Sequence, residues 1–495
     1  MSIVVDPVRT HARTTPERFA LGDAESGRRW TWAEFDRNAD RLAGWLCERL
    51  GPASRGRVAV LARNHPLQLV LQFACERAGA LFVPLNWRLA LPELSVIVAD
   101  ADPALIFHDA EFLVPDHPVE RHLLGTVETL GKAGQSPVAV ARLGWDEPIT
   151  LLYTSGTSGK PKGVILTAAN AFWGSTNFSL GNAVSRDSVF LCDMPLFHTA
   201  GLFAAVRTPI LAGGAVWISA KFDADRTIAR IADRALGITH YFSVPQMATM
   251  LWQHPDFAPE EFCRLVTYAT GGAPNPKVQV ERFARAGIRF SDGFGMSETG
   301  SNFGMPTSDP DVLVAKAGSC GLPYVSVESR IVDDRGDDVP SGATGELWLR
   351  GPSISPGYWN QPGLTAQAFE QGWFKTGDAA MRDADGFTFI VDRRKDMYIS
   401  GGENVYPAEV EAVLAELPDL AQAAVIGVPD PRWGEVGKAF LVLAPGSDLT
   451  PAAAISHCLM RLAKFKVPAS VEIVDALPNT ASGKVQKHLL RERAG

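Results

Sequence analysis

The sequence predicts an α/β protein with a large N-terminal domain of doubly wound sheets, a small β-rich subdomain and a smaller α+β C-terminal domain. Three observations support this class. The 495 residues exceed what one hydrophobic core usually serves, so at least two domains are expected. Strand-like and helix-like segments alternate before residue 320, as they do in parallel sheets covered by helices. After residue 320 the pattern changes to short β runs and then to a mixture of helices and strands.

Composition places the chain among ordinary globular proteins, with 46% hydrophobic and 21% charged residues. The net charge of −8 and the lack of a long basic run argue against a nucleic-acid or anionic-membrane partner. No run of apolar residues is long enough for an integral membrane segment, and the N-terminus does not resemble a signal peptide. The six cysteines form no Cys-x-x-Cys pair, which favours a reducing, cytoplasmic location. The oligomeric state, including a homodimer, is left open.

The first part of the chain supplies the βα alternation. Apolar residues recur at helical spacing in two segments, and Gly51-Pro52 and Gly79 would end the two helices. Short apolar runs between them predict buried strands. The expected elements are helices over 32–50 and 67–78, and strands over 57–61, 81–84 and 105–107.

From residue 149 onward, each predicted strand runs into a loop of unusual residues. The expected strands are 149–153, 189–192, 237–242, 264–269 and 288–290, and the loops that follow include 154–163, 193–201, 243–245, 270–274 and 291–298. In open α/β sheets ligands lie beyond the carboxyl ends of the strands, so these loops would gather on one rim. This convergence predicts an active site there.

The C-terminal part of the chain divides again. Turns rich in Gly, Asp and Pro separate short β runs over 320–394, which predicts the β-rich subdomain. The domain boundary is expected in the basic run 392–396, near Lys395, so that the domains are 1–394 and 395–495. The C-terminal domain is expected to hold helices over 408–417 and 452–462 and strands over 423–428 and 439–443.

One stretch, residues 149–167, carries the strongest chemical signal. A strand-like run enters a turn rich in hydroxyls and glycines, and Lys160 and Lys162 add positive charge. Free N–H groups of glycine, hydroxyl donors and lysines together suit phosphate binding. Pro161 after Lys160 excludes a Walker-type loop, and no serine lies in the frame of a nucleophile elbow. The candidate phosphate-binding residues are Thr154, Ser155, Gly156, Thr157, Ser158, Gly159 and Lys162.

The signature Thr-Ser-Gly-Thr-Ser-Gly-Lys-Pro-Lys-Gly at 154–163 resembles the phosphate loop of the adenylate-forming enzymes. That superfamily comprises acyl- and aryl-CoA ligases, stand-alone adenylation domains and firefly-type luciferases. The resemblance extends through five separated motifs over nearly the whole chain. It implies ATP, Mg²⁺ and coenzyme A as cofactors, an acyl-adenylate intermediate, and a C-terminal domain that moves as a catalytic cap.

The resemblance also assigns nucleotide contacts. The family usually has an aromatic-Gly-x-Thr-Glu sequence, commonly with Tyr first, where this chain has 294–298 with Phe first and Ser fourth. It places Glu298 on Mg²⁺, Ser297 on phosphate, Asp292 at the adenine amino group, and Asp378 and Arg393 at the ribose. Further nucleotide contacts are expected from Gly271, Gly272, Ala273, Gly293, Phe294, Gly295 and Met296.

In the C-terminal domain the resemblance identifies Lys484 as the lysine that bridges the carboxylate and the α-phosphate. Where the family often has a basic residue, this chain has Asn479. The family's cap rotates about a hinge that matches Lys395, and it then presents 400–404, with Gly401 and Gly402, to a pantetheine tunnel. Candidate CoA contacts are Arg88, Trp433, Phe465 and Lys466.

The predicted acyl pocket is aromatic and apolar. His198 is the third candidate catalytic residue beside Lys484 and Glu298, and the resemblance places it at the entry of the thiol tunnel. Adenylation domains for α-amino acids usually have aspartate there, so histidine favours an acid without an amine. No arginine lies in 294–306, which disfavours a second carboxylate, and a medium-chain aliphatic or aryl acid is expected. The pocket residues would be Phe197, His198, Phe203, Phe242, Ser243, Tyr268 and Phe303.

The main prediction is therefore an ATP-dependent carboxylic acid–CoA ligase. The alternative is a stand-alone adenylating enzyme that loads the pantetheine arm of a carrier protein. A non-catalytic nucleotide-binding module is disfavoured because Glu298 and Lys484 are both present. A luciferase-like oxidation stays open on the motifs, although nothing in the pocket indicates it.

Overall fold

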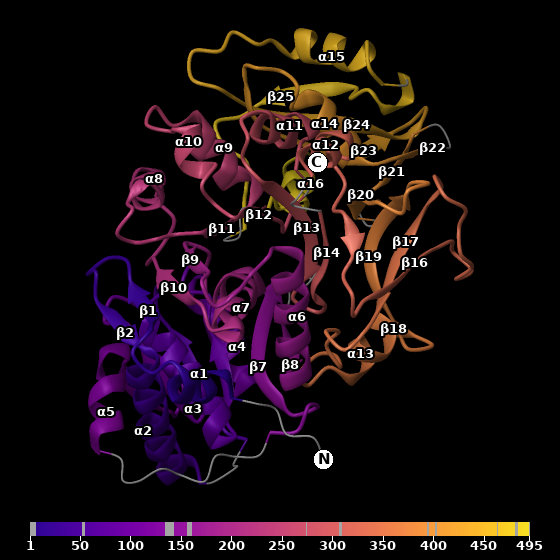
Figure 1. Ribbon diagram of the computed structural model, residues 1–495. Helices are drawn as coiled ribbons and strands as arrows, with labels where there is room; N and C mark the ends of the chain where they lie inside the picture. The colour runs from indigo at the N-terminus through magenta and orange to yellow at the C-terminus, as the bar shows by residue number, and fades with distance from the viewer. Residues whose placement is uncertain are drawn as a thin grey trace.

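Four sheets organise the part of the chain that the computed structural model describes (Figure 1). The described residues are 6–51, 55–133, 143–155, 161–273, 275–305, 309–393, 396–400, 403–462, 464–480 and 484–494. Two large sheets and a third, smaller one precede residue 394. The fourth belongs to the C-terminal elements, which Figure 1 draws in orange to yellow at the top.

The first sheet has six strands in the order β6-β5-β3-β4-β7-β8 and is parallel except for the antiparallel pair β7/β8. Its strands are β3 (Arg57–Leu61), β4 (Leu81–Pro84), β5 (Leu105–His108), β6 (Glu120–Leu123), β7 (Pro148–Ser155) and β8 (Pro161–Thr167). Helix α4 (Leu91–Ala101) contributes to a hydrophobic core on one face of this sheet.

Helices α2 (Trp32–Leu50) and α3 (Pro66–Ala78) belong to a core that also includes residues of both large sheets. Every residue of α3 is buried, as expected for a helix that is apolar on most sides. Helix α2 begins with a capping box of Thr31 and Glu34 and ends at Gly51, where the sequence predicted its end. Helices α1 (Pro7–Thr14) and α5 (Val127–Ala133) pack against α2.

The second sheet has nine strands in the order β15-β14-β13-β12-β11-β9-β10-β1-β2. The run from β13 to β1 is parallel, whereas the outer pairs β1/β2, β13/β14 and β14/β15 are antiparallel. Its strands are β1 (Phe19–Asp23), β2 (Arg29–Thr31), β9 (Val189–Cys192), β10 (Ala215–Ile218), β11 (His240–Ser243), β12 (Thr267–Thr270), β13 (Phe290–Met296), β14 (Gly300–Gly304) and β15 (Leu322–Pro323).

Helical segments connect these strands. Helix α6 follows β8 directly, and its start is capped reciprocally by Thr167 and Asn170. The segments are α6 (Ala168–Gly181), the π-helix η2 (Ala200–Arg207), α7 (Thr208–Ala212), α8 (Ala224–Ala232), α9 (Pro245–Gln253), α10 (Pro259–Phe262), α11 (Lys277–Arg285) and α12 (Pro310–Ala315).

The third sheet is antiparallel and forms the expected β-rich region. Its strands are β16 (Glu328–Val332), β17 (Thr344–Arg350), β18 (Phe369–Glu370), β19 (Trp373–Arg382) and β20 (Thr388–Arg393), and helix α13 (Pro362–Ala368) precedes β18. The long strands β17 and β19 are the inner pair of this sheet, and its small core also takes in Phe303 from β14. The β-rich region is thus packed onto the second sheet.

The C-terminal elements surround two hydrophobic clusters that contain only residues beyond 397. The elements are β21 (Tyr398–Ser400), β22 (Glu403–Val405), α14 (Pro407–Leu414), β23 (Leu420–Asp430), β24 (Gly434–Leu443), α15 (Pro451–Leu459), β25 (Ser470–Ile473) and α16 (Lys487–Ala494). Lys395, the expected hinge, lies outside the described residues, so the boundary at 394/395 stays a prediction. Across the described residues, no helix combines the length and apolarity that crossing a membrane requires.

The fold class is the predicted one, and several strands, among them 57–61, 81–84 and 189–192, have the predicted bounds. The strands expected over 237–242 and 264–269 begin three residues later, as β11 (His240–Ser243) and β12 (Thr267–Thr270). One expected loop is a strand. Residues 291–298, expected as a loop, lie largely in strand β13, which forms a hairpin with β14. The glycines that indicated a turn instead allow close strand pairing, since a Cβ on Gly295 would lie 2.3 Å from the Gly300 carbonyl oxygen.

Candidate active site

The predicted phosphate loop is the connection between β7 and β8. Thr154 pairs with Lys162 and Ser155 with Pro161 across the two strands, so the hydroxyl of Thr154 and the ammonium of Lys162 belong to neighbouring strand ends. The residues in between, Gly156, Thr157, Ser158, Gly159 and Lys160, lie outside the described residues. The hairpin itself agrees with the expected strand–turn–strand arrangement.

A segment after β17 runs beside β8 and was not singled out from the sequence. The backbone N–H of Ile165 donates to the Gly357 carbonyl (3.0 Å), and that of Trp359 donates to the Gly163 carbonyl (2.7 Å). Between them, Tyr358 forms a β-bridge with Val164. The Tyr358 side chain therefore lies at the end of the phosphate-loop hairpin.

Tyr358 contacts two of the predicted site residues. Its hydroxyl donates a 3.0 Å hydrogen bond to Oε1 of Glu298. The ammonium nitrogen of Lys162 lies 5.4 Å from the centre of the Tyr358 ring, within the range of a cation–π contact. Glu298 and Lys162 are thus brought together around one aromatic side chain.

Glu298 lies in the short turn that joins β13 to β14. The turn is closed by two hydrogen bonds, from Thr299 N–H to the Met296 carbonyl (3.3 Å) and from Met296 N–H to the Thr299 hydroxyl (3.2 Å). Ser297 shares the turn, so its hydroxyl and the Glu298 carboxylate are presented from the same end of the hairpin. The half-buried Glu298 is an oxygen donor of the kind that Mg²⁺ prefers.

The candidate adenine site lies where β12 and β13 end side by side. Asp292 is buried, and its Oδ1 accepts hydrogen bonds from the Gly293 N–H (3.0 Å) and the Thr270 hydroxyl (3.2 Å). Burial raises the pKa of this carboxyl group to about 7. A Cβ on Gly271 would lie 3.1 Å from the Gly293 carbonyl oxygen, so glycine keeps these two backbones in close contact. Gly272 and Ala273 continue this strand end, and Gly272 has a φ of +87°.

The candidate ribose acid, Asp378, lies on β19 opposite Arg393 of β20. Asp378 is only 3% exposed, and its backbone N–H donates to the Thr376 hydroxyl (3.1 Å). Burial raises the pKa of Cys320, and the negative charges of Asp292 and Asp378 raise it further. Both acids therefore lie in the same part of the molecule. The side chain of Arg393 lies outside the described part of the chain.

His198 lies just before η2, and its backbone N–H donates to the Pro195 carbonyl (3.1 Å). Its ring nitrogen Nε2 is buried without a hydrogen-bond partner among the described residues. Burial, together with the positive charges of Lys484 and Arg88, lowers the pKa of His198 to about 4. This histidine is therefore neutral at physiological pH.

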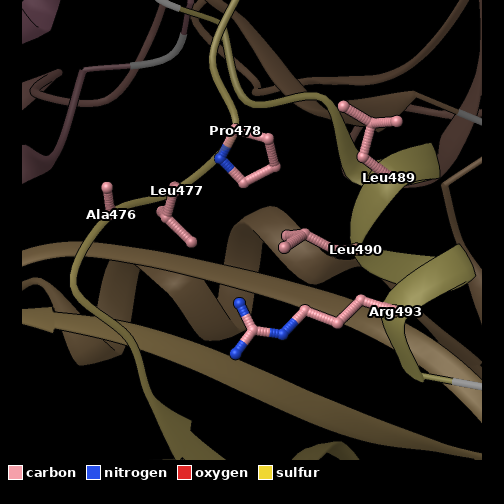
Figure 2. A pocket seen from close by; sticks show the side chains of 6 residues that line it. All are labelled: Ala476, Leu477, Pro478, Leu489, Leu490 and Arg493. Atoms are coloured by element: carbon pink, nitrogen blue, oxygen red, sulfur yellow. The ribbon is translucent and has the colours of Figure 1, made fainter.

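The loop that carries Lys484 is anchored in the C-terminal part of the chain. The N–H of Thr480 donates to the Lys484 carbonyl (2.7 Å), and the Lys484 N–H donates back to the Thr480 hydroxyl (3.1 Å). Figure 2 shows a groove between residues 476–478 and helix α16, in which the buried side chains of Leu477 and Leu490 lie. Lys484 itself is exposed.

A small cavity of about 10 Å³, room for about one water molecule, lies between α6, η2 and β14. Phe203 is the member of the predicted acyl pocket that lines it, and Thr199, next to His198, lines it as well. The hydroxyls of Thr199 and Ser353 are buried without a hydrogen-bond partner among the described residues. The lining residues are Leu166, Asn170, Ala171, Gly174, Thr199, Phe203, Gly300, Ser301 and Ser353.

The structure does not bring the other predicted pocket residues together. Phe242 lies 3.5 Å from the position of a Cβ on Gly271, at the rim. Ser243 and Tyr268 point to the opposite face of the sheet, where their hydroxyls share a 2.9 Å hydrogen bond in the packed core. Phe303 packs with Phe294 against the core of the β-rich region. Successive side chains of a strand point to opposite faces, and this separates Ser243 from Phe242.

The remaining candidates concern CoA. Arg88 lies with its guanidinium carbon 5.6 Å from the centre of the Phe197 ring and 4.5 Å from that of Trp87. This arginine is therefore close to the His198 side of the site. Trp433 is 48% exposed on the C-terminal part. Gly401 and Gly402 lie outside the described residues.

Comparison with known proteins identifies the family of this chain. The family model described as AMP-binding enzyme matches residues 8–359, and that of the AMP-binding enzyme C-terminal domain matches 409–484. The chain is 39% identical over 491 residues to the feruloyl-CoA synthase of an Amycolatopsis species, covering 99% of this chain and 98% of the relative. It is 35% identical to the indoleacetate–CoA ligase of Aromatoleum aromaticum, covering 97% and 96% of the two chains.

A solved structure similar to this chain allows two states to be compared. The o-succinylbenzoate CoA synthetase of Bacillus subtilis with its acyl-adenylate, OSB-AMP, has a TM-score of 0.89 at 30% identity and covers 99% of both chains. A double mutant of that synthetase with the product analogue OSB-NCoA has a TM-score of 0.72. The arrangement seen here is thus more similar to that of the acyl-adenylate complex. From sequence and structure together, the chain belongs to the family of AMP-binding, adenylate-forming enzymes, in the branch of the AMP-forming acid–CoA ligases.

Proposed function

We propose that this chain joins an aryl or medium-chain aliphatic carboxylic acid to CoA in two steps at the rim formed by β7/β8, β12 and β13. In the first step a carboxylate oxygen attacks the α-phosphorus of ATP, and pyrophosphate leaves. In the second step the CoA thiol attacks the acyl carbon, and AMP leaves. The observation that carries the proposal is the contact of Tyr358 with both Glu298 and Lys162, which holds a candidate metal ligand beside the candidate phosphate loop.

Positioning and fixed charge are what the first step needs, because both reactants are anions. Lys162 and Lys484 would supply cations on the two sides of the reacting phosphate. Glu298 would hold Mg²⁺, which takes carboxylate and phosphate oxygens and reduces the charge of the triphosphate. Asp292 would accept from the adenine amino group, and Asp378 from the ribose hydroxyls. These roles are supported by the contacts of Glu298 and Lys162 with Tyr358 and by the position of Asp292 and Asp378 near Cys320.

The character of the acid follows from the cavity beside Phe203. No charged side chain is among its described lining residues, so a second carboxylate on the substrate would have no partner there. By their names, two of the relatives act on feruloyl and indoleacetate, both of which are aryl acids, and this favours an aryl acid for this chain too.

His198 would close the acyl site from the thiol side. Because burial keeps its pKa low, it stays neutral and adds no cation that would attract the acid away from Lys484. Rotation of the C-terminal domain about Lys395 would then withdraw Lys484 and bring 400–404 to the site for the second step. The better match to the acyl-adenylate complex supports the first of these two arrangements as the one described above.

A carrier protein is the second candidate acceptor. A relative from Streptomyces coeruleorubidus that is named a fatty acid–[acyl-carrier-protein] ligase is 35% identical and covers 98% of this chain. The two acceptors are separated by comparing thioester formation with free CoA and with a holo-carrier protein at equal concentrations of adenylated acid. Faster thioester formation on the carrier protein would replace CoA as the acceptor and leave the first step intact.

The experiment that tests the activity is pyrophosphate release from ATP and Mg²⁺ with a panel of acids. The panel contains cinnamate-type, benzoate-type and indoleacetate acids, and aliphatic acids from C2 to C16. We expect release that depends on the acid and is fastest with aryl acids. Two results would contradict the proposal. One is pyrophosphate release at the same rate without any acid, and the other is release with malonate but with none of the acids in the panel.

A further inference from the structure

Tyr358 is fixed by the contacts of its backbone. Residues 353–359 lie along β8, with hydrogen bonds from Ile165 N–H to Gly357 and from Trp359 N–H to Gly163. The Tyr358 N–H donates to the hydroxyl of Thr365 (2.9 Å), which anchors the segment to helix α13. The ring of Tyr358 therefore has little freedom to leave the end of the phosphate-loop hairpin.

The same segment also holds the backbone of Glu298. The N–H of Ser355 donates a 2.7 Å hydrogen bond to the Glu298 carbonyl, and the Ser355 hydroxyl donates to the Ile165 carbonyl (2.7 Å). One short segment thus connects the β13/β14 turn to strand β8. The distance between Glu298 and the hairpin is set by backbone contacts.

The side chain of Tyr358 completes this connection chemically. A phenol offers a donor for an anion at its hydroxyl and an electron-rich face for a cation. Here the hydroxyl donates to Glu298 Oε1 (3.0 Å), and the Lys162 ammonium lies 5.4 Å from the ring centre. With one carboxylate oxygen bound to the hydroxyl, the Glu298 side chain is restricted in its rotation, and the direction of its other oxygen is restricted with it.

We propose that Tyr358 is a positioning residue: its hydroxyl orients the Glu298 carboxylate for the metal ion of Mg·ATP, and its ring orients Lys162 for the phosphates. This role rests on the proposed function, because it assigns Glu298 and Lys162 to the metal and the phosphates. In this role Tyr358 acts through Glu298 and Lys162. Its removal should therefore weaken binding of the metal–nucleotide complex without deleting any ligand.

The test uses the full-length protein and two variants that separate hydroxyl from ring. Tyr358→Phe removes the hydroxyl and keeps the face toward Lys162, whereas Tyr358→Leu removes both. Tyr153→Phe is a matched control, because the Tyr153 hydroxyl also donates to a carboxylate, that of Asp100 on α4 (2.6 Å), away from Glu298. For each protein, calorimetry without any acid measures the dissociation constant of Mg·ATP and of ATP in EDTA, and thermal unfolding measures stability.

A hydrogen bond to a charged group accounts for about tenfold or more in an equilibrium constant. We expect Tyr358→Phe to raise the dissociation constant of Mg·ATP by about tenfold and to leave that of metal-free ATP unchanged. Tyr358→Leu should weaken both, and Tyr153→Phe neither. The midpoint of unfolding of Tyr358→Phe should fall no further than that of Tyr153→Phe.

Two results would overturn the inference. One is unchanged Mg·ATP affinity in Tyr358→Phe while the unaltered protein binds Mg·ATP, and this leaves the proposed function intact. The other is equal weakening of Mg·ATP and metal-free ATP in Tyr358→Phe, together with a larger loss of stability than in Tyr153→Phe, which indicates a general structural role. If the unaltered protein binds no Mg·ATP, both the inference and the proposed function fail.

Discussion

Removal of the Lys484 ammonium should separate the two half-reactions. An ammonium about 4 Å from a phosphate charge interacts with about 4 kcal/mol at the effective dielectric constant of a protein surface. That energy corresponds to roughly a thousandfold in rate, and losing one fixed charge-stabilising group typically costs about 10²–10³. Because Lys484 is exposed, solvent screening places the expected loss toward the lower end. We therefore expect Lys484→Ala to slow acyl-adenylate formation by about 10²-fold.

The assay measures each step by itself. Acid-dependent exchange of pyrophosphate into ATP reports the first step, and conversion of synthetic acyl-AMP and CoA into thioester reports the second. The second step should be unchanged in Lys484→Ala, since the lysine would be withdrawn from the site at that stage. Lys438→Ala is the control, because Lys438 forms a surface ion pair with Glu472 (3.0 Å) in the same domain and should affect neither step. Equal loss of both steps in Lys484→Ala would refute the division of labour.

Three further outcomes follow from the described contacts. Gly174→Ala should narrow the cavity beside Phe203, because the added Cβ would lie 3.7 Å from the Cα of Gly300, so the KM for aryl acids should rise while the dissociation constant of ATP stays the same; an unchanged KM would place the acid elsewhere. ATP binding should weaken as the pH falls through about 7, because protonation of Asp292 replaces a charged acceptor for the adenine amino group by a weaker, neutral one, and Asp292→Asn should abolish this pH dependence in a binding titration. Arg207→Ala should lower the free energy of unfolding by about 3–5 kcal/mol in a denaturant titration, because it leaves Glu76 buried without its 2.9 Å partner; a loss below ~1 kcal/mol would contradict the importance of this pair.

The burial of Asp292 also predicts how stability depends on pH. Its folded pKa is raised from 3.8 to about 7, so the folded protein keeps a proton that the unfolded chain releases. The contribution of this group to stability is therefore fully present below pH 4 and is lost as the pH rises toward 7. Subtracting the stability profile of Asp292→Asn from that of the unaltered protein isolates this contribution, and a difference that rises with pH would contradict the sign.

Local patterns predicted the strands and the phosphate-loop hairpin well, because each depends on residues that are close together in the sequence. Residues 57–61 and 189–192 are short apolar runs bounded by polar or turn residues, and they form strands with those bounds. The motif at 294–298 predicted Glu298 as a site residue, but its glycines predicted a loop where the structure has a strand. Its glycines serve the close pairing of β13 with β14, which becomes evident only once β14 is known.

Contacts between distant segments were beyond sequence reasoning. Tyr358 stands in the sequence Gly-Tyr-Trp-Asn, which has neither periodicity nor a motif, and its importance arises from the bridge to Val164 and the hydrogen bond to Glu298. Tyr268 was assigned to the acyl pocket because it is aromatic and near a strand end. A place near a strand end does not determine toward which face of the sheet the Tyr268 side chain points. In the structure this side chain packs against Phe283 and Phe290 in the core.

The central claim is that acid, ATP and CoA react together at one rim. The most direct measurement is the stoichiometry of products when a cinnamate-type acid, Mg·ATP and CoA are incubated with the enzyme. The account predicts one AMP and one pyrophosphate for each acyl-CoA, and accumulation of acyl-AMP with pyrophosphate when CoA is omitted. Formation of ADP, or of AMP without acid, would contradict it.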